Sequence, residues 1–158
     1  MPSDLYWIDA SGSGLAIMAR PRAGYWLEDE IDHWQRSGVG IVVSLLKAEE
    51  VTDLGLEREI ELCEKAGVRF LSFPIPDRGL PFDPDTAMRF AAEIADMRKP
   101  VAIHCRAGIG RSSIMAAAVL VSEGVDPQSA LAAIEKARGL PIPDTEEQRV
   151  WVMGLEKS

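Results

Sequence analysis

The segment VAIHCRAGIGRSS, residues 101–113, contains the residue types that a nucleophilic reaction on an anion needs. An apolar run ends in a histidine and in Cys105, and Arg111 follows after a glycine-rich loop. Gly108 and Gly110 allow a tight backbone path in which successive N–H groups turn inward. A cysteine in such a loop, just ahead of a helix, is a candidate nucleophile rather than an ordinary core residue.

The loop and the helix that it opens favour a phosphate group as the anion. Free N–H groups at a helix start, together with the helix dipole, attract negative charge. The same field favours a thiolate over a thiol at Cys105. The planar guanidinium of Arg111 can bind two oxygens of an oxyanion at once. A backbone cradle, a thiolate and a forked cation together predict attack of sulfur on a phosphoryl group.

The elements that must position this segment alternate between strands and helices. Short apolar or β-branched runs predict strands at 5–10, 15–19, 41–46, 68–75 and 101–104. Helical periodicity with start and stop signals predicts helices at 26–38, 56–67, 83–99, 112–124, 126–139 and 144–157. Such alternation indicates an α/β fold with a mostly parallel central sheet and helices on both faces. The length fits a single domain over residues 1–158, and ligands of such sheets bind beyond the carboxyl ends of the strands.

Composition argues against several classes of function. The net charge of −8 does not favour binding to nucleic acid or to an anionic membrane, so an anionic substrate must meet a local cluster of positive charge. No apolar run is long enough to span a bilayer, and the N-terminus does not resemble a signal peptide. Two cysteines are too few for a disulfide framework, which predicts a reducing, cytoplasmic compartment. The oligomeric state stays open.

The motif His-Cys-x5-Arg-Ser, residues 104–112, resembles the signature of the cysteine-dependent protein tyrosine phosphatase superfamily. The short chain and the run PIPDRGLP, residues 74–81, are most similar to a compact dual-specificity phosphatase. The resemblance covers residues 24–152 and implies a tyrosine-phosphatase-like fold. It also implies a reaction in which Cys105 forms a cysteinyl-phosphate, while a carboxylic acid protonates the leaving oxygen and then activates water. No metal or other cofactor is implied.

The resemblance assigns roles around the loop. It makes Cys105 the nucleophile and Arg111 a phosphate ligand. His104 matches a family histidine that orients the loop and helps to keep the thiolate. Ser112 matches a hydroxyl that donates to the sulfur and helps it to leave, although a serine that caps the helix is the alternative. The phosphate cradle is expected to consist of Arg106, Ala107, Gly108, Ile109, Gly110 and Arg111.

Asp77 is the candidate general acid. It precedes Cys105 by 28 residues, follows an apolar strand and lies in a turn, which matches the family's acid loop. Asp83 and Asp85 flank Pro84 and are interpreted as the start of the next helix. A plain turn is the alternative for Asp77, because Pro-Asp-x-Gly favours a β-turn. An aspartate acts as an acid at neutral pH only where nearby negative charge, here phosphate and thiolate, favours its protonated form.

Three further residues have two interpretations each. Gln148 matches a family glutamine that positions the hydrolytic water, but Thr145-x-x-Gln148 is also a capping box. Arg78 could meet a second anionic group of the substrate or could be a solvated turn residue. Cys63 lies on the apolar face of a predicted helix and is most simply a core residue. A disulfide between Cys63 and Cys105 would require the two to lie close together, which the sequence does not show.

The sequence thus predicts a phosphomonoester hydrolase that acts on phosphotyrosine and also on phosphoserine and phosphothreonine, in a phosphoprotein or a small phosphate. No long insertion is present that would build a deep phosphotyrosine slot. Ile109 stands where lipid phosphatases of the superfamily tend to carry lysine, which argues against phosphoinositides. The alternatives are a rhodanese-like sulfurtransferase, which would need neither Asp77 nor Ser112, and a non-catalytic phosphoprotein-binding module, which would usually have lost one catalytic residue.

Overall fold

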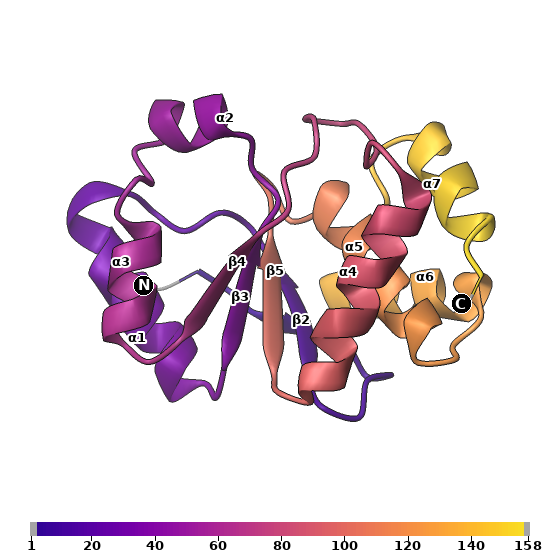
Figure 1. The fold of residues 1–158 in the computed structure, drawn as a ribbon, viewed down its shortest axis with the longest axis horizontal. Helices are drawn as coiled ribbons and strands as arrows, with labels where there is room; N and C mark the ends of the chain where they lie inside the picture. The colour runs from indigo at the N-terminus through magenta and orange to yellow at the C-terminus, as the bar shows by residue number, and fades with distance from the viewer. Residues whose placement is uncertain (1–2, 157–158) are drawn as a thin grey trace.

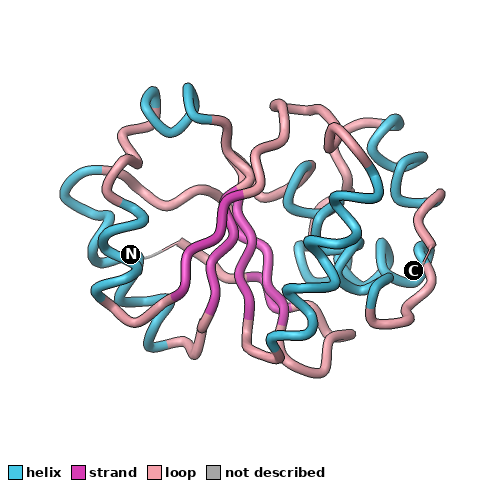
Figure 2. The backbone as a smooth tube through the Cα atoms, in the orientation of Figure 1, coloured by secondary structure: helices cyan, strands magenta, loops and turns pink. Residues whose placement is uncertain are grey.

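The computed structural model describes residues 3–156 and has a central sheet between two layers of helices (Figure 1, Figure 2). The strand order in the sheet is β1-β2-β5-β3-β4. All neighbours are parallel except β1, which is antiparallel to β2. This confirms the predicted α/β fold with a mostly parallel sheet. The strands are β1 (Tyr6–Trp7), β2 (Leu15–Met18), β3 (Ile41–Ser44), β4 (Arg69–Ser72) and β5 (Val101–His104).

Helices cover both faces of the sheet, with α1 and α3 on one side and α4 to α7 on the other (Figure 1). A short 3-10 turn over Gly24–Trp26 leads into α1. None of the helices in residues 3–156 combines the length and apolar character that crossing a membrane requires. The α-helices are α1 (Leu27–Arg36), α2 (Ala48–Asp53), α3 (Glu59–Lys65), α4 (Pro84–Met97), α5 (Arg111–Ser122), α6 (Pro127–Arg138) and α7 (Glu146–Met153).

The alternation of side chains along β3 explains its continuous apolar sequence. Ile41 and Val43 pack into the core under α4 to α7, while Val42 packs into the core under α1 and α3. Strands buried on both faces carry apolar residues at every position, because neither face meets water. The same rule applies to β5, where Ile103 and Ala102 face opposite cores. The central parallel strands therefore hold the loops at their carboxyl ends on a rigid base.

Several predicted element boundaries were wrong. β1 and β4, at the two edges of the sheet, cover only part of the predicted strands at 5–10 and 68–75, and β3 ends at Ser44 rather than at residue 46. α3 begins at Glu59 rather than at residue 56, and α2 was not predicted at all. The last helix ends at Met153 in the structure, whereas residue 157, its predicted end, lies outside the described residues.

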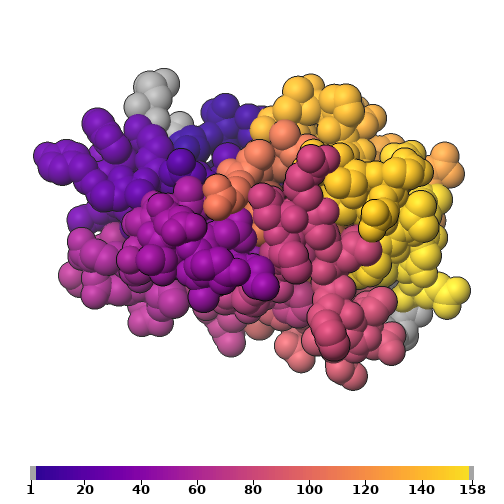
Figure 3. All heavy atoms as spheres, turned by 90° about the horizontal axis from the view of Figure 1, so that it is seen from above, coloured from indigo at the N-terminus to yellow at the C-terminus, as the bar shows by residue number. Residues whose placement is uncertain are grey.

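The carboxyl ends of β3, β4 and β5 meet at one edge of the sheet, at the top of Figure 1. The loop that follows β5 lies there, between chain segments from the N-terminal and the C-terminal halves, as Figure 3 shows from above. This edge is the expected ligand-binding position in a parallel sheet.

Candidate active site

The loop between β5 and α5, residues 105–110, passes too close to its neighbours for larger residues at two positions. Gly108 has a φ of +71°, and a Cβ atom there would lie 2.6 Å from the backbone of Met18. A Cβ atom at Gly110 would lie 2.8 Å from the Cβ atom of Asp144. Glycine is therefore required at Gly108 both for backbone conformation and for space, and at Gly110 for space.

The peptide groups of this loop present their N–H groups to the inside of its curve. The carbonyls of residues 106–108 accept hydrogen bonds from Arg20 and Arg138, which do not line the pocket inside the loop. In a planar trans peptide, the N–H group of the next residue points the opposite way. No hydrogen bond joins the N–H groups of residues 107–109 to another residue among 3–156. These N–H groups are free to bind an anion.

Cys105 adjoins a pocket of about 70 Å³ at this loop, and its side chain is almost inaccessible, with 3% of the residue exposed. The Oγ atom of Ser112 donates a hydrogen bond to Sγ of Cys105 over 3.1 Å. No side chain caps the N-terminus of α5, so Ser112 serves the sulfur and not the helix end. The pocket is lined by Asp77, Arg78, Cys105, Arg106, Ala107, Ile109, Gly110, Arg111 and Asp144.

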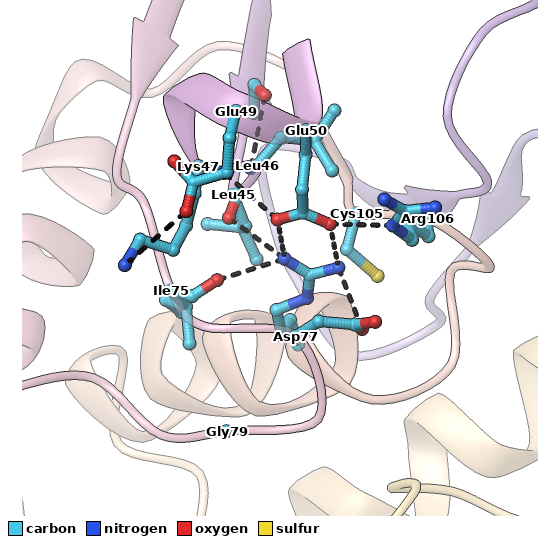
Figure 4. Close-up of polar contacts among 12 residues, drawn as sticks. Leu45, Leu46, Lys47, Glu49, Glu50, Ile75, Asp77, Gly79, Cys105 and Arg106 are labelled. Carbon is cyan, nitrogen blue, oxygen red and sulfur yellow. Dashed lines mark hydrogen bonds and ion pairs between the residues drawn. The ribbon is translucent and has the colours of Figure 1, made fainter. Parts of the chain in front are cut away.

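The guanidinium of Arg111 is buried and is bound on one edge by Glu50, whose carboxylate and its dashed contacts are drawn in Figure 4. Its Nη1 and Nη2 atoms donate to the two carboxylate oxygens of Glu50 over 2.7 and 3.0 Å, and Nη1 also donates to the carbonyl of Ile75 over 2.9 Å. Nη2 donates its second hydrogen bond to Asp77 over 3.1 Å. Within residues 3–156, Nε of Arg111 has no hydrogen-bond partner. The edge formed by Nε and Nη2 is therefore the one that can receive a phosphate.

Glu50 is a site residue that the sequence analysis missed. Burial would raise the pKa of Glu50, but hydrogen bonds from Arg111, the Lys47 N–H group and Arg106 outweigh it and lower the pKa to about 2. Glu50 comes from α2, whose six residues show no hydrophobic periodicity. It was missed because Glu50 and Arg111 are 61 positions apart in the sequence, so no local pattern marks the pairing.

The structure brings Asp77 to the pocket and leaves Asp83 and Asp85 away from it. Asp77 lies in a turn closed by a hydrogen bond from the Gly79 N–H group to the Pro76 carbonyl over 2.8 Å, and its side chain is 57% exposed. Asp83 caps the N-terminus of α4 by accepting from the Asp85 N–H group. This agrees with the helix-start interpretation of both residues.

His104 contacts a buried carboxylate on the far side of β5 from the pocket. Its Nε2 atom lies 2.7 Å from Oε2 of Glu59, and both side chains are buried. His104 does not line the pocket, so its position fits an orienting role and not proton transfer to a substrate. Glu59, on α3, was also missed, because a single acidic residue at a helix start gives no signal of its partner.

Gln148 forms the capping box of α7 and also contacts the candidate acid loop, which is the turn at residues 76–79 that carries Asp77. Its Oε1 atom accepts from the N–H groups of Asp144 and Thr145, and the Thr145 hydroxyl accepts from the Gln148 N–H group. Its Nε2 atom donates to the Gly79 carbonyl over 3.0 Å. The capping interpretation is therefore present in the structure, while the water-positioning role stays a prediction.

Arg78 forms an ion pair with Asp144 across the mouth of the pocket, over 3.2 Å. Its φ of +57° places it at the third position of the turn that carries Asp77, a position where such a φ is required in type II turns. Arg78 and Asp144 therefore connect the acid loop to the segment that precedes α7.

Cys63 and Cys105 are both free thiols, and they lie in different cores. Cys63 packs under α1 and α3, and Cys105 packs with the layer of α4 to α7. Burial, with Glu59 and Glu64 nearby, raises the pKa of Cys63 to about 12. Cys63 is a core residue, and the structure does not bring it to the pocket.

Residues 16–125 match a family model described as "Polymorphic toxin system, DSP-PTPase phosphatase". Cyclin-dependent kinase inhibitor 3 of Rattus norvegicus is 27% identical over 118 residues, which cover 72% of this chain and 55% of that protein. The chain thus spans about half the length of this relative.

Two solved structures show how widely the fold is shared. A kinase-associated phosphatase, with serine in place of its catalytic-site cysteine, superimposes with a TM-score of 0.84 at 19% identity, over 96% of this chain and 93% of its own. Tk-PTP in its active form superimposes with a TM-score of 0.74 at 29% identity, over 96% of this chain and 95% of its own. Neither comparison favours a sulfurtransferase.

Proposed function

The chain belongs to the DSP-PTPase phosphatases, which are cysteine-dependent dual-specificity and tyrosine phosphatases, and from this premise we propose that it hydrolyses phosphomonoesters through a cysteinyl-phosphate on Cys105. The observation that carries the proposal is the convergence of four side chains on one small pocket. Cys105, Asp77 and Arg111 line it, and the Ser112 hydroxyl donates a hydrogen bond to the Cys105 sulfur.

In the first step, Sγ of Cys105 attacks phosphorus and the bond between phosphorus and the leaving oxygen breaks. Asp77 gives its proton to that oxygen, so the leaving group departs as a neutral alcohol or phenol. The free N–H groups of residues 107–109 and the Nε–Nη2 edge of Arg111 bind the other three oxygens, whose negative charge is spread in the transition state.

Substrate binding must change the partner of Arg111. In the structure without substrate, Nη2 of Arg111 donates a hydrogen bond to the carboxylate of Asp77. A phosphate that takes the Nε–Nη2 edge displaces Asp77 from Arg111 and puts a dianion beside it. The displaced carboxyl group is then free to face the leaving oxygen of the substrate. Phosphate binding thereby prepares the acid that the first step consumes.

In the second step, water attacks phosphorus and the bond between sulfur and phosphorus breaks. Asp77, now a carboxylate, takes a proton from the water, and inorganic phosphate is released. The hydrogen bond from Ser112 stabilises the departing thiolate at 3.1 Å. Gln148 would position the water only by giving up part of its present bonding, because its Oε1 atom accepts from two backbone N–H groups and its Nε2 atom donates to the Gly79 carbonyl.

We propose phosphoproteins as the substrate class, with phosphotyrosine as the preferred group and phosphoserine and phosphothreonine also accepted. None of the pocket's lining residues within 3–156 is aromatic, so no ring-shaped slot restricts the pocket to phosphotyrosine, which supports acceptance of phosphoserine and phosphothreonine. No lysine lines the pocket either, and Ile109 occupies the variable loop position, which supports the preference against phosphoinositides. Because the chemistry needs a reduced Cys105, we also propose a reducing cellular compartment.

The test compares two activities and a set of substrates. The proposal predicts hydrolysis of an aryl phosphate and no sulfur transfer from thiosulfate to cyanide. A panel of phosphotyrosine, phosphoserine and phosphothreonine peptides with a soluble phosphoinositide should rank phosphotyrosine first and the phosphoinositide last. Sulfur transfer without phosphate release would overturn the proposed reaction, and a phosphoinositide ranked first would overturn the substrate class.

A further inference from the structure

Three successive carbonyls on the outer side of the loop at residues 105–110 accept hydrogen bonds from two arginines. The Arg106 carbonyl accepts from the Arg20 N–H group over 3.0 Å. The Ala107 and Gly108 carbonyls both accept from the side chain of Arg138, over 3.3 and 3.1 Å. Arg138 therefore controls two of the three peptide groups whose N–H groups face the pocket.

Arg138 is held in this position from its other side by an aromatic ring. It is the last residue of α6, and its guanidinium carbon lies 4.2 Å from the centroid of the Tyr6 ring on β1. The distance fits a cation–π contact. An arginine that only interacted with the dipole of its own helix would stay near the last carbonyls of that helix and would not contact a separate loop. Here Nε and Nη2 both reach the loop while the ring covers the guanidinium.

We propose that Arg138, supported by Tyr6, is a positioning residue that keeps the phosphate-binding loop in its anion-binding conformation. This inference rests on the proposed phosphatase function. Glycine permits many backbone conformations, so Gly108 alone does not fix the direction of the neighbouring N–H groups. Two charge-assisted hydrogen bonds to the carbonyls fix it instead.

Loss of Arg138 would leave two loop carbonyls without a protein donor and allow either peptide to rotate. A rotated peptide turns a carbonyl oxygen toward the pocket, where it repels the thiolate of Cys105 and the oxygens of a bound phosphate. The positive charge behind the loop, which also favours a bound anion, is removed as well. The consequence is weaker binding of anions without a change at any residue that touches them.

The test measures inhibition by orthovanadate and by inorganic phosphate, with thermal unfolding of the same preparations. Lys136→Ala is the matched control, because Lys136 is an exposed cation in the last turn of the same helix. Arg138→Ala should raise the inhibition constants of both anions about tenfold relative to Lys136→Ala. This is the effect expected from the loss of one charge-assisted hydrogen bond. Tyr6→Leu should raise these inhibition constants by a smaller factor. Tyr6→Phe keeps the ring, so its inhibition constants should match those of wild type.

Anion inhibition of Arg138→Ala equal to that of Lys136→Ala would overturn the proposal, even if the melting temperature fell, because a purely structural residue would lower stability alone. If Arg138→Ala does not fold, Arg138→Lys decides. It keeps the charge, but one ammonium group cannot replace the fork toward two carbonyls, so wild-type inhibition would also overturn the proposal. A wild-type protein that neither binds vanadate nor hydrolyses an aryl phosphate would instead refute the proposed function itself.

Discussion

At the scale of single residues, the hydrogen bonds of Arg111 determine what the pocket can bind. Glu50 occupies the Nη1–Nη2 edge, the Ile75 carbonyl takes another Nη1 hydrogen, and Asp77 holds Nη2. A guanidinium has five N–H donors in a fixed plane, so a phosphate meets the one edge that is free or easily vacated. Glu50 thus orients Arg111 without touching the substrate in our mechanism.

The first prediction tests this orientation with Glu50→Gln. The amide keeps the shape of the side chain but removes its charge and turns an NH₂ group toward a guanidinium NH₂. Loss of one charge-assisted hydrogen bond and its ion pair should lower kcat/KM roughly ten- to hundredfold. Steady-state kinetics with an aryl phosphate measure the change. Glu49→Gln, an exposed position on the same helix, should match wild type, and equal activity of both variants would refute the role of Glu50.

The second prediction concerns the pH dependence of stability. The pKa of Glu50 is about 2 in the folded protein, compared with 4.5 as its ordinary value. A carboxyl group with a lowered pKa in the folded state stabilises that state above its unfolded pKa, and this contribution is lost as the pH falls toward the folded pKa. Urea unfolding should therefore show the difference between wild type and Glu50→Gln shrinking below about pH 4.5. A difference that stays constant between pH 5 and pH 3 would contradict this.

At the scale of secondary-structure elements, the acid loop is tied to the segment before α7 at two points. Gln148 donates to the Gly79 carbonyl, and Arg78 pairs with Asp144. Gln148 is buried and is itself fixed by the capping box of α7. The position of Asp77 at the pocket therefore depends on the packing of α7 against α5 as well as on its own turn.

The third prediction tests the acid loop through the leaving group. Asp77→Asn should slow release of alkyl groups from phosphate much more than release of nitrophenol, because a good leaving group departs with little help from a proton. The single-turnover rate of leaving-group release should depend only weakly on the pKa of the leaving group in wild type, and strongly in Asp77→Asn. Asp85→Asn, at the exposed start of α4, is the control. Equal slopes for wild type and Asp77→Asn would mean that Asp77 is only a turn residue.

The sequence predicted the elements whose information is local and missed the contacts between distant ones. The strands β3 and β5 and the loop at residues 105–110 follow from apolar runs and glycine positions. The pairings of Glu50 with Arg111 and of Glu59 with His104 span 61 and 45 residues, and no periodicity marks either carboxylate. The contact of Arg138 with the outer side of the loop was also missed. A basic residue at the carboxyl end of a helix is already explained by the helix dipole, so it gives no sign of a distant partner.

At the scale of the whole molecule, the pocket differs from the rest of the chain in its charged residues, and the two cysteines lie in different cores. The net charge is −8, yet the pocket includes Arg78, Arg106 and Arg111 among its lining residues. Asp144, Glu50 and Asp77 pair with these arginines, so the attraction for an anionic substrate comes mainly from the free N–H groups of residues 107–109 and from the Nε–Nη2 edge of Arg111. The sheet separates the core that contains Cys63 from the one that contains Cys105.

The fourth prediction follows from this separation. At neutral pH iodoacetamide should alkylate Cys105, which lines the pocket, and spare Cys63, which does not line it and whose pKa burial raises to about 12. Inorganic phosphate should protect Cys105. Mild peroxide should oxidise Cys105 reversibly without forming a bond to Cys63. Peptide mapping by mass spectrometry checks all three results, and either preferential alkylation of Cys63 or a Cys63–Cys105 disulfide would contradict the separation of the two thiols.

The central claim is that phosphate passes through the sulfur of Cys105, and the most direct measurement is the detection of that intermediate. Wild type and Asp77→Asn are mixed with an aryl phosphate, quenched in acid within the first turnovers and mapped by mass spectrometry. The account predicts a phosphoryl group on Cys105, more of it in Asp77→Asn because water activation is slowed, and none in an inactive but folded Cys105→Ser. Phosphate release at the wild-type rate by Cys105→Ser, or a phosphoryl group on another residue during turnover, would contradict the account.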